Sequence, residues 1–418
     1  MSLSTQPYKG ARDFYPEDKR TQKYILEVLR RVVESFGYQE YDAPLLEPFE
    51  LYAAKSGEEI VNEQLYWFED RGGRRMAIRP EMTPSVSRMV AAKRQELAYP
   101  LRLYSIPNLW RYERPQRGRL REHYQLNVDI FGVEGSEADA EIIQVADEIL
   151  KSLGARQDMY RININSRQAM VEAMNSFGLS ETELKAAYKL VDKMPKLDDA
   201  SFDKLLSDQI GETKAASLRN YLRNDQPPER VRRILEMLKT SGVDSAVYEP
   251  SVVRGIEYYS DIVFEVFDTN PENARALFGG GRYDGLVELF GVEHLPVVGF
   301  GMGDVSLQNF LETHSLLPRL TAAADVSVIL IGDVYGRVQP ILKRLRAEGI
   351  NTAVDFSQRK LDPQIKSAVK SGVGFALFIG EKELESHQLK LRDLAKGEER
   401  DLTIDEIVDE LVSSRKTD

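Results

Sequence analysis

The sequence lacks or is poor in the residues that make cross-links and bind transition metals. Its 418 residues include no cysteine and four histidines. Without cysteine there is no disulfide and no cysteine-ligated zinc or iron–sulfur centre. Because the four histidines are scattered along the chain, we predict no metal site built from protein cysteines or histidines.

Long apolar runs are also missing. No stretch approaches the roughly 20 apolar residues that a membrane-spanning helix needs, and the first residues lack the basic start and apolar stretch of a signal peptide. We therefore expect a soluble, cytoplasmic protein with no membrane association. The length favours two or three domains, and 42% hydrophobic residues can form a sizeable core.

An excess of positive charge is absent too, because the net charge is −11. This balance argues against a protein coated in positive potential. It does not exclude nucleic acid, since binding depends on local patches. The distribution of arginines is therefore more informative than their total.

Strand and helix patterns alternate irregularly over the first 320 residues. Amphipathic helices are predicted at 17–36 and 136–154, an extended piece at 38–46, and strands at 65–68, 76–78, 263–267 and 297–301. Helical patterns dominate between about 166 and 243. We predict an α+β fold for residues 1–320, with an antiparallel sheet core and a helical insertion at about 166–243.

Beyond residue 318 apolar strands alternate with amphipathic helices. The strands are expected at 326–331, 352–354 and 375–379, and the helices at 338–348 and 363–370. Such alternation predicts a small α/β domain with a largely parallel sheet over residues 325–418.

The densest group of candidate functional side chains lies between Arg111 and Asp129. Five arginines fall within residues 111–121 of an acidic chain, and arginine presents a fork of donors that matches phosphate oxygens. Strand alternation would put Arg111 and Glu113 on one face. After a turn at 115–118, the returning strand would present Arg121, His123, Gln125, Asn127 and Asp129 together. We predict an anion-binding hairpin; the alternative is a solvated basic hairpin.

Two further segments carry polar groups suited to a small substrate. Glu81 and Thr83 can both accept hydrogen bonds from an ammonium group, unless Thr83 instead caps the helix that follows. Arg254 precedes the pair Tyr258 and Tyr259, which suits an anion beside a small polar ring, although paired tyrosines often simply pack together.

Two glycine-rich segments complete the set of candidates. Residues 278–285 suggest a turn that fits neither the dinucleotide nor the P-loop pattern. Residues 298–304 suggest a small-residue strand leading into a helix, with room for a flat ligand or for tight strand–helix packing. Glycines in either segment would allow close approach of a ligand to the backbone.

Together these segments resemble the histidyl-tRNA synthetases, a class II aminoacyl-tRNA synthetase family, over nearly the whole chain. Residues 254–259 (RGIEYY) and 280–285 (GGRYDG) are similar to the two histidine-specific motifs of that family. Residues 37–44 are similar to motif 1 and residues 111–121 to motif 2 and its loop. Residues 299–307 occupy the place of motif 3, and the tail from about 325 resembles the anticodon-binding domain.

The resemblance implies ATP-dependent ligation of L-histidine to tRNA(His) through a histidyl-adenylate, by a homodimer formed through motif 1. ATP would enter as its Mg²⁺ complex, with no tightly bound cofactor. Arg111 and Arg254 would be catalytic. ATP would be bound by Arg111, Glu113, Arg121 and His123, and histidine by Glu81, Thr83, Gln125, Asp129, Arg254, Tyr258, Tyr259 and Tyr283. The tRNA acceptor end would meet Gln116 and Arg121.

The sequence departs from the family pattern at three positions. Ser306 stands where the motif 3 arginine grips the γ-phosphate, so either another cation does that work or ATP activation is compromised. His123 replaces a phenylalanine that stacks on adenine, and Asp129 replaces a longer glutamate.

Two alternative functions follow from the same resemblance. One is a catalytically inactive paralogue that acts as regulatory subunit of ATP phosphoribosyltransferase in histidine biosynthesis. Arg254, the basic loop and the C-terminal domain argue against it. The other is a class II synthetase for threonine, proline or glycine, and the two histidine-specific motifs argue against that.

Overall fold

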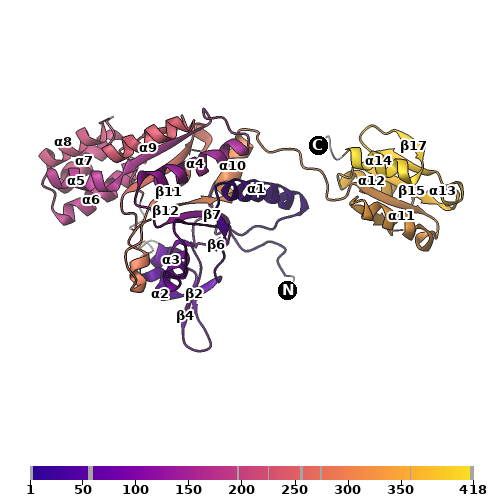
Figure 1. Ribbon diagram of the computed structural model, residues 1–418, viewed down its shortest axis with the longest axis horizontal. Helices are drawn as coiled ribbons and strands as arrows, with labels where there is room; N and C mark the ends of the chain where they lie inside the picture. Colours follow the sequence, from indigo (N-terminus) through magenta and orange to yellow (C-terminus); the bar gives the residue numbers. More distant parts are fainter. Residues whose placement is uncertain are drawn as a thin grey trace. The chain divides into compact units, whose positions relative to one another are not determined.

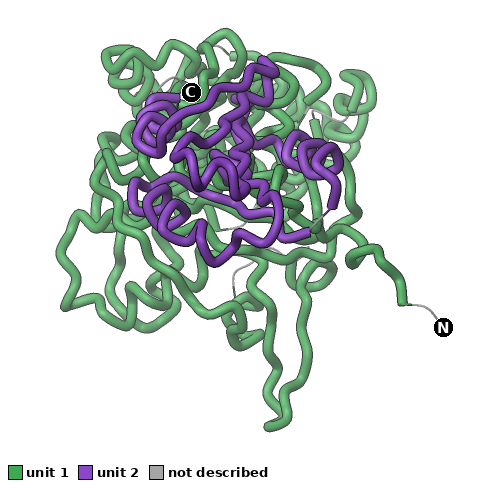
Figure 2. The backbone as a smooth tube through the Cα atoms, turned by 90° about the vertical axis from the view of Figure 1, so that its right-hand side faces the viewer, with its two compact units in different colours: residues 1–317 green, residues 318–418 purple. Residues whose placement is uncertain are grey.

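The computed structural model describes residues 3–54, 60–194, 197–224, 226–254, 258–273, 275–357 and 359–414. The chain forms two compact units, Met1–Leu317 and Pro318–Asp418 (Figures 1 and 2). Each unit has its own hydrophobic core. Among the described residues, no helix is both long and apolar enough to cross a membrane.

A nine-stranded sheet dominates the first unit, in the order β1-β5-β7-β12-β11-β10-β8-β9, with β6 paired to β7. Its strands are β1 (Gln39–Glu40), β5 (Leu101–Ser105), β6 (Asn108–Trp110), β7 (Glu122–Phe131), β8 (Tyr160–Ser166), β9 (Ala246–Tyr248), β10 (Ile262–Asp268), β11 (Ala276–Arg282) and β12 (Val297–Gly303). From β5 through β8 all pairs are antiparallel, and the pairs at the two ends are parallel. The predicted α+β fold with an antiparallel core is confirmed.

Strand alternation gives this sheet two different faces. Along β7, the side chains of Leu126, Val128 and Ile130 join the main core. That core also receives the apolar sides of α1 (Pro16–Ser35), α4 (Ser136–Ser152), α9 (Glu229–Thr240) and α10 (Asp304–Thr313). Because successive side chains point to opposite faces, Gln125, Asn127 and Asp129 lie on the other face. The candidate site is built there.

Smaller elements border that second face. The strands β2 (Leu46–Pro48), β3 (Trp67–Glu69) and β4 (Arg75–Ile78) form a separate sheet in the order β2-β4-β3. The strands predicted at 65–68 and 76–78 are therefore confirmed, and they pair with each other as β3 and β4. The extended piece expected at 38–46 is divided between β1 and β2. Beside this sheet lie α2 (Phe49–Ala53) and α3 (Thr83–Ala92). The single-turn helix η1 (Ile60–Gln64) precedes β3 in the chain.

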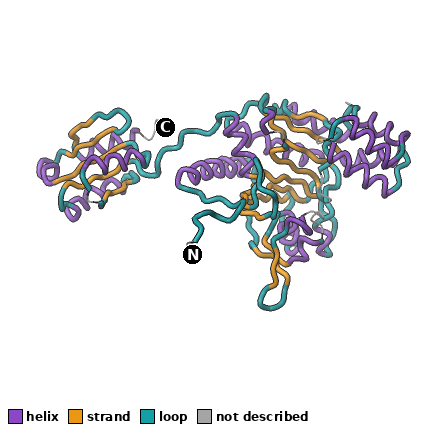
Figure 3. Tube along the Cα trace, turned by 180° about the vertical axis from the view of Figure 1, so that it is seen from behind, coloured by secondary structure: helices purple, strands orange, loops and turns teal. Residues whose placement is uncertain are grey.

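The described part of the stretch between β8 and β9 contains five α-helices of two kinds. The helices α5 (Arg167–Ser176), α6 (Glu181–Lys193), α7 (Asp199–Ile210) and α8 (Glu212–Leu222) share a core of their own and lie together at one side of the unit (Figure 3). In contrast, α9 packs against α4 and joins the main core, with Val231, Ile234 and Leu238 buried. The end of the insertion thus belongs structurally to the sheet domain.

The second unit contains a five-stranded sheet in the order β14-β13-β15-β16-β17. Its elements are β13 (Val326–Ile331), α11 (Tyr335–Ala347), β14 (Thr352–Asp355), α12 (Leu361–Lys370), β15 (Phe375–Gly380), α13 (Glu381–Ser386), β16 (Leu389–Asp393), β17 (Glu399–Leu402) and α14 (Ile404–Ser414). β13 is parallel to β14 and β15, whereas β15, β16 and β17 are antiparallel neighbours. The prediction of a largely parallel sheet missed the β16–β17 hairpin.

Candidate active site

Four glycines form the floor of the site on the second face of the sheet. Side chains from neighbouring segments lie directly over them: Arg254 over Gly279, Tyr259 over Gly281, Asp129 over Gly299 and Gln125 over Gly301. A Cβ at Gly281 would come within 2.9 Å of the Tyr259 ring, and one at Gly301 within 2.9 Å of the Gln125 amide. Any larger residue would displace these side chains, so the glycines set the depth of the site.

The predicted turn at 278–285 is therefore wrong. Residues 276–282 form β11, a buried strand between β10 and β12. Glycine is unfavourable in a strand interior and often marks a position where another group approaches closely. Here the approaching groups are the side chains of the site, which is why β11 resembles a turn in the sequence.

Three tyrosine rings are gathered beside this floor. The ring centroid of Tyr258 lies 5.2 Å from that of Tyr259 and 5.8 Å from that of Tyr283. The Tyr258 hydroxyl donates to Glu81 Oε2 over 3.1 Å. Thr83 is the first residue of α3, and the residue at the N-cap position is Met82, which makes no side-chain capping bond. The alternative of Thr83 as the helix cap is therefore wrong.

Asp129 and Tyr283 form the polar end of this group. The Tyr283 hydroxyl donates to Asp129 Oδ1 over 2.5 Å. Burial raises the pKa of Asp129 to about 7, although the hydrogen bond from Tyr283 partly opposes that rise. Burial also raises the pKa of Tyr283 well above its usual value, so this hydroxyl remains a donor at neutral pH. The pair thus presents a carboxyl group whose protonation changes near neutrality.

Arg254 lies over the floor in an unusual backbone conformation. Its φ is +47°, in the left-handed region that non-glycine residues rarely adopt. One terminal nitrogen donates to the Phe264 carbonyl over 3.3 Å and lies 3.9 Å from a Glu265 carboxylate oxygen. Its Nε is buried and has no hydrogen-bond partner among the described residues. A guanidinium with a buried, unused donor is suited to an anionic ligand.

The arginine-rich hairpin exists, but its first strand is shorter than predicted. Strand β6 pairs with β7 and ends at Trp110, before Arg111. The Arg111 amide still donates to the Arg121 carbonyl over 2.8 Å, and the Glu113 amide turns back to the Arg111 carbonyl over 2.7 Å. Because of this tight turn, the prediction that Arg111 and Glu113 share a strand face is wrong. The Arg111 Nε donates to the Pro80 carbonyl over 2.8 Å.

His123 lies on β7 opposite Leu109 of β6. Burial, together with the positive charges of Arg111, Arg12 and Arg119, lowers the pKa of its imidazole to about 3. The ring is therefore neutral at physiological pH. A neutral, flat imidazole among three arginines can stack on a planar aromatic ligand without repelling those cations.

The guanidinium of Arg121 is engaged by other protein groups. Its guanidinium lies 3.9 Å from the centroid of the Tyr112 ring and donates to the Tyr8 hydroxyl over 2.7 Å. It also donates to the Glu113 carbonyl over 3.1 Å. Gln116 lies further along the loop, bridged to Arg119 through backbone bonds of 3.0 Å.

Three arginines near the site were assigned no role from the sequence. Arg12 forms an ion pair of 2.7 Å with Asp304, and Arg119 one of 3.3 Å with Glu113. Arg275 lines a cavity beside Arg119. Arg119 lies in the predicted arginine cluster and could have been found there. Arg12 and Arg275 come close to the site only through the fold. Arg12, for example, lies 292 positions along the chain from its partner Asp304.

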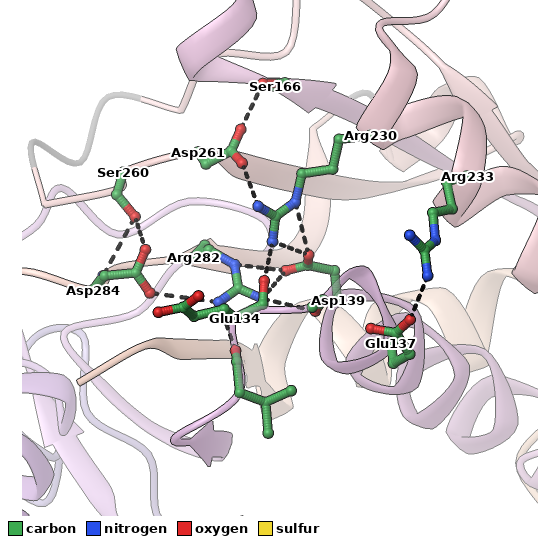
Figure 4. A network of polar contacts seen from close by, with 12 residues as sticks. Glu134, Glu137, Asp139, Ser166, Arg230, Arg233, Ser260, Asp261, Arg282 and Asp284 are labelled. Atoms are coloured by element: carbon green, nitrogen blue, oxygen red, sulfur yellow. Dashed lines mark hydrogen bonds and ion pairs between the residues drawn. The ribbon is translucent and has the colours of Figure 1, made fainter.

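Arg282 fixes the end of β11 through a buried polar network on the helix side of the sheet (Figure 4). Its Nε donates to Asp139 Oδ1 over 3.0 Å, and Arg230 of α9 binds the other oxygen of Asp139 over 2.8 Å. Arg230 also contacts Asp261 over 3.2 Å. The next residue, Tyr283, is therefore anchored to α4 and α9 through the backbone. This network positions the site without being part of it.

The antiparallel sheet carries Arg254 and the arginine-rich hairpin on one face. This is the fold of the class II aminoacyl-tRNA synthetases. The family model described as histidyl-tRNA synthetase matches residues 10–305, and a model described as an anticodon binding domain matches residues 325–414. The chain belongs to the histidyl-tRNA synthetase family.

Individual relatives agree with this assignment. The chain is 42% identical to a histidine–tRNA ligase of Leptospira biflexa, with 94% of each protein covered. The fold is shared with a histidyl-tRNA synthetase from a Nostoc species, at 23% identity, a TM-score of 0.84 and coverage of 99% and 100%. It is also shared with a Bacillus halodurans protein described as an ATP phosphoribosyltransferase regulatory subunit/histidyl-tRNA synthetase, at 22% identity, a TM-score of 0.74 and coverage of 91% and 100%.

Proposed function

We propose that the protein joins L-histidine to tRNA(His) in two steps, with a histidyl-adenylate as the intermediate and ATP as the energy source. The observation that carries this proposal is the position of Arg254. It lies partly buried on the same face as the Asp129–Tyr283 pair, with its Nε buried and unused among the described residues. This arrangement offers a cation for a carboxylate and phosphate beside a polar end for an imidazole ring.

Histidine would lie across the glycine floor. Asp129 and Tyr259 would bind the two imidazole nitrogens, while Glu81, Thr83 and Gln125 would hold the α-amino group. Tyr258 and Tyr283 would line the pocket and orient Glu81 and Asp129 through their hydroxyls. A ring that lacked these donors and acceptors would leave buried polar groups unpaired, which can reject analogues by roughly 10⁴–10⁵.

ATP would bind beside the hairpin. Arg111 would contact the α-phosphate, Glu113 would accept from the adenine amino group and His123 would stack on the base. For Arg121, whose guanidinium is engaged with Tyr8 and Tyr112, a supporting role under Glu113 fits better than direct contact with ATP. Mg²⁺ would enter with ATP as part of the substrate, and we propose no tightly bound cofactor.

Adenylate formation needs positioning and positive charge more than acid–base chemistry. The ionised carboxylate of histidine attacks the α-phosphorus, a carboxylate–phosphorus bond forms, and the bond to the β-phosphate oxygen breaks to release pyrophosphate. Arg111 and Arg254 would stabilise the charge that develops on the phosphoryl oxygens. In the second step the terminal ribose hydroxyl of tRNA attacks the activated carbonyl and AMP leaves.

The transfer RNA would contact both units. Gln116 and Arg121, in the loop of the hairpin, would face the acceptor end. We assign residues 1–320 to the catalytic domain, with its helical insertion at about 166–243, and residues 325–418 to anticodon binding. The match of residues 325–414 to an anticodon binding domain supports the last assignment. Charging of tRNA belongs to translation, so we place the protein in the cytoplasm.

We also propose a homodimer formed around residues 37–44. Apolar side chains are exposed next to this segment: Leu45 is 46% and Leu46 41% exposed, and Trp67 on the same small sheet is 55% exposed. Such a group favours burial against a second protein surface. Sedimentation equilibrium would test it, because a monomer at micromolar concentration would contradict the proposal.

The test of the proposed function is histidine-dependent exchange between ATP and pyrophosphate, run in parallel with threonine, proline and glycine. We expect exchange with histidine, followed by charging of tRNA(His). Exchange with another amino acid but not with histidine would favour a different class II synthetase. The loss of the motif 3 arginine at Ser306 is the one feature that favours the inactive regulatory paralogue, and absence of any exchange would support that alternative.

A further inference from the structure

A cavity adjoins the proposed ATP site. It has a volume of about 330 Å³ and lies between the hairpin loop, the start of β11 and the first turns of α10. Its lining includes Arg117, Arg119, Arg275 and Ser306, with Glu272 as the acidic residue. Three guanidinium groups around one carboxylate leave an excess of positive charge. Such a cavity suits a ligand with several negative charges.

Ser306, at the motif 3 arginine position, cannot supply a cation or a free donor to this cavity. Its hydroxyl lies 2.6 Å from the Leu277 carbonyl and 3.2 Å from the Gly303 carbonyl. A serine hydroxyl has one proton, and a backbone acceptor already takes it. The bond to Leu277 ties the first turn of α10 to the start of β11. This places Arg275, two residues before Leu277, beside the position of Ser306.

The three arginines of the cavity differ in how they are engaged. Arg117 donates from Nε to Asn273 over 3.2 Å and from a terminal nitrogen to Thr313 over 3.1 Å. Arg119 is paired with Glu113 at 3.3 Å. Arg275 is exposed, and within the described parts of the chain its guanidinium makes no hydrogen bond or ion pair. It is therefore the cation of this cavity that can turn to a ligand without breaking an existing contact.

The cavity is linked to the proposed nucleotide site through Arg119. That side chain lines the cavity and contacts Glu113. Its charge also lowers the pKa of His123, although burial and the charges of Arg111 and Arg12 have larger effects. We infer that Arg275 binds the terminal phosphates of ATP and the departing pyrophosphate, and so replaces the cation that Ser306 lacks. This inference rests on the proposed function, because that function supplies the polyphosphate.

Binding measurements on the full-length protein separate this inference from the proposed function. In Arg275→Ala we expect the dissociation constants of ATP and of pyrophosphate alone to rise about tenfold or more, because a charge-assisted hydrogen bond is lost. The affinity for AMP should not change. Arg275→Lys should recover part of the loss. The matched control is Arg71→Ala, an exposed arginine in the tip of the β3–β4 hairpin.

A relocation variant makes the test sharper. Arg275→Ala/Ser306→Arg moves the guanidinium to the facing helix and should recover ATP and pyrophosphate binding relative to Arg275→Ala. Unchanged ATP and pyrophosphate affinity in Arg275→Ala, or an equal loss for AMP, would overturn the role of Arg275. Histidine-dependent exchange by the unmodified protein reports on the proposed function separately, since these affinities are measured without amino acid.

Discussion

At the scale of single residues, Arg254 combines two unfavourable features that a purely structural residue would not need. Its left-handed backbone, at a φ of +47°, costs on the order of 1–3 kcal/mol. Its buried Nε, without a partner among the described residues, adds a desolvation cost. Both are understandable if the side chain is held ready for an anion.

The first prediction is that Arg254→Ala lowers histidine-dependent exchange by about 10²–10³ while the melting temperature stays the same or rises. The fold should tolerate the change because it removes a partly buried charge whose contacts are one hydrogen bond of 3.3 Å and a carboxylate oxygen at 3.9 Å. Arg254→Lys is the matched variant, which keeps the charge without the planar fork, and it should retain part of the activity. Exchange within threefold of the unmodified protein would contradict a catalytic role.

The second prediction concerns the pH dependence of histidine binding. Burial raises the pKa of Asp129 to about 7, so the ionised fraction rises about tenfold between pH 6 and 8. An imidazole N–H binds the ionised carboxylate, so the affinity for histidine should increase across this range and level off above it. His123 does not interfere, because its pKa is about 3. Isothermal titration at several pH values measures the slope.

Asp129→Asn is the control for that slope. The amide has nearly the same shape but does not titrate, so any remaining pH dependence belongs to free histidine itself. If the two proteins show the same pH profile, Asp129 is not the group that binds the imidazole.

At the scale of elements, the glycines of β11 and β12 determine the depth of the site. The third prediction is that Gly299→Ala reduces kcat/KM for histidine by about 100-fold or more and destabilises the fold by about 1–3 kcal/mol. The new methyl group would overlap both the Asp129 carboxylate and the Val128 carbonyl. Steady-state exchange and thermal unfolding measure the two effects.

Gly285→Ala is the matched control from the same glycine-rich region. Gly285 is exposed, and an added Cβ would meet nothing within 4 Å. We expect both activity and stability to be unchanged there. A similar loss in the two variants would mean that the region tolerates alanine poorly for reasons other than the floor of the site.

The elements also show how far the sequence could predict this structure. The helices α1 and α4 and the strands with alternating patterns were found because periodicity reports one buried face. Strand β11 was missed because a strand is identified by large apolar or β-branched side chains. In β11 glycines stand at those positions, and side chains from other segments lie over them. Arg275 could not be found at all, since its proximity to Ser306 depends on how α10 meets the sheet.

At the scale of the whole molecule, the two units have separate hydrophobic cores. The main core of the second unit uses residues between 326 and 411, among them Val328, Leu377 and Leu411. The cores around the large sheet use residues before 318. Since hydrophobic burial is the dominant favourable term in folding, the first unit contains what it needs to fold by itself. The proposed chemistry lies entirely within it.

The fourth prediction follows from that separation. A chain that ends after Leu317 should keep histidine-dependent exchange within a few fold of the full protein, because every proposed histidine and ATP ligand precedes this residue. Charging of tRNA(His) should fall by about 100-fold or more, since linked binding sites act through effective concentration and one of them is lost. Circular dichroism and a cooperative melt would verify that the shortened chain is folded. Equal losses of exchange and charging in a folded chain would mean that the second unit serves the catalytic site rather than the anticodon.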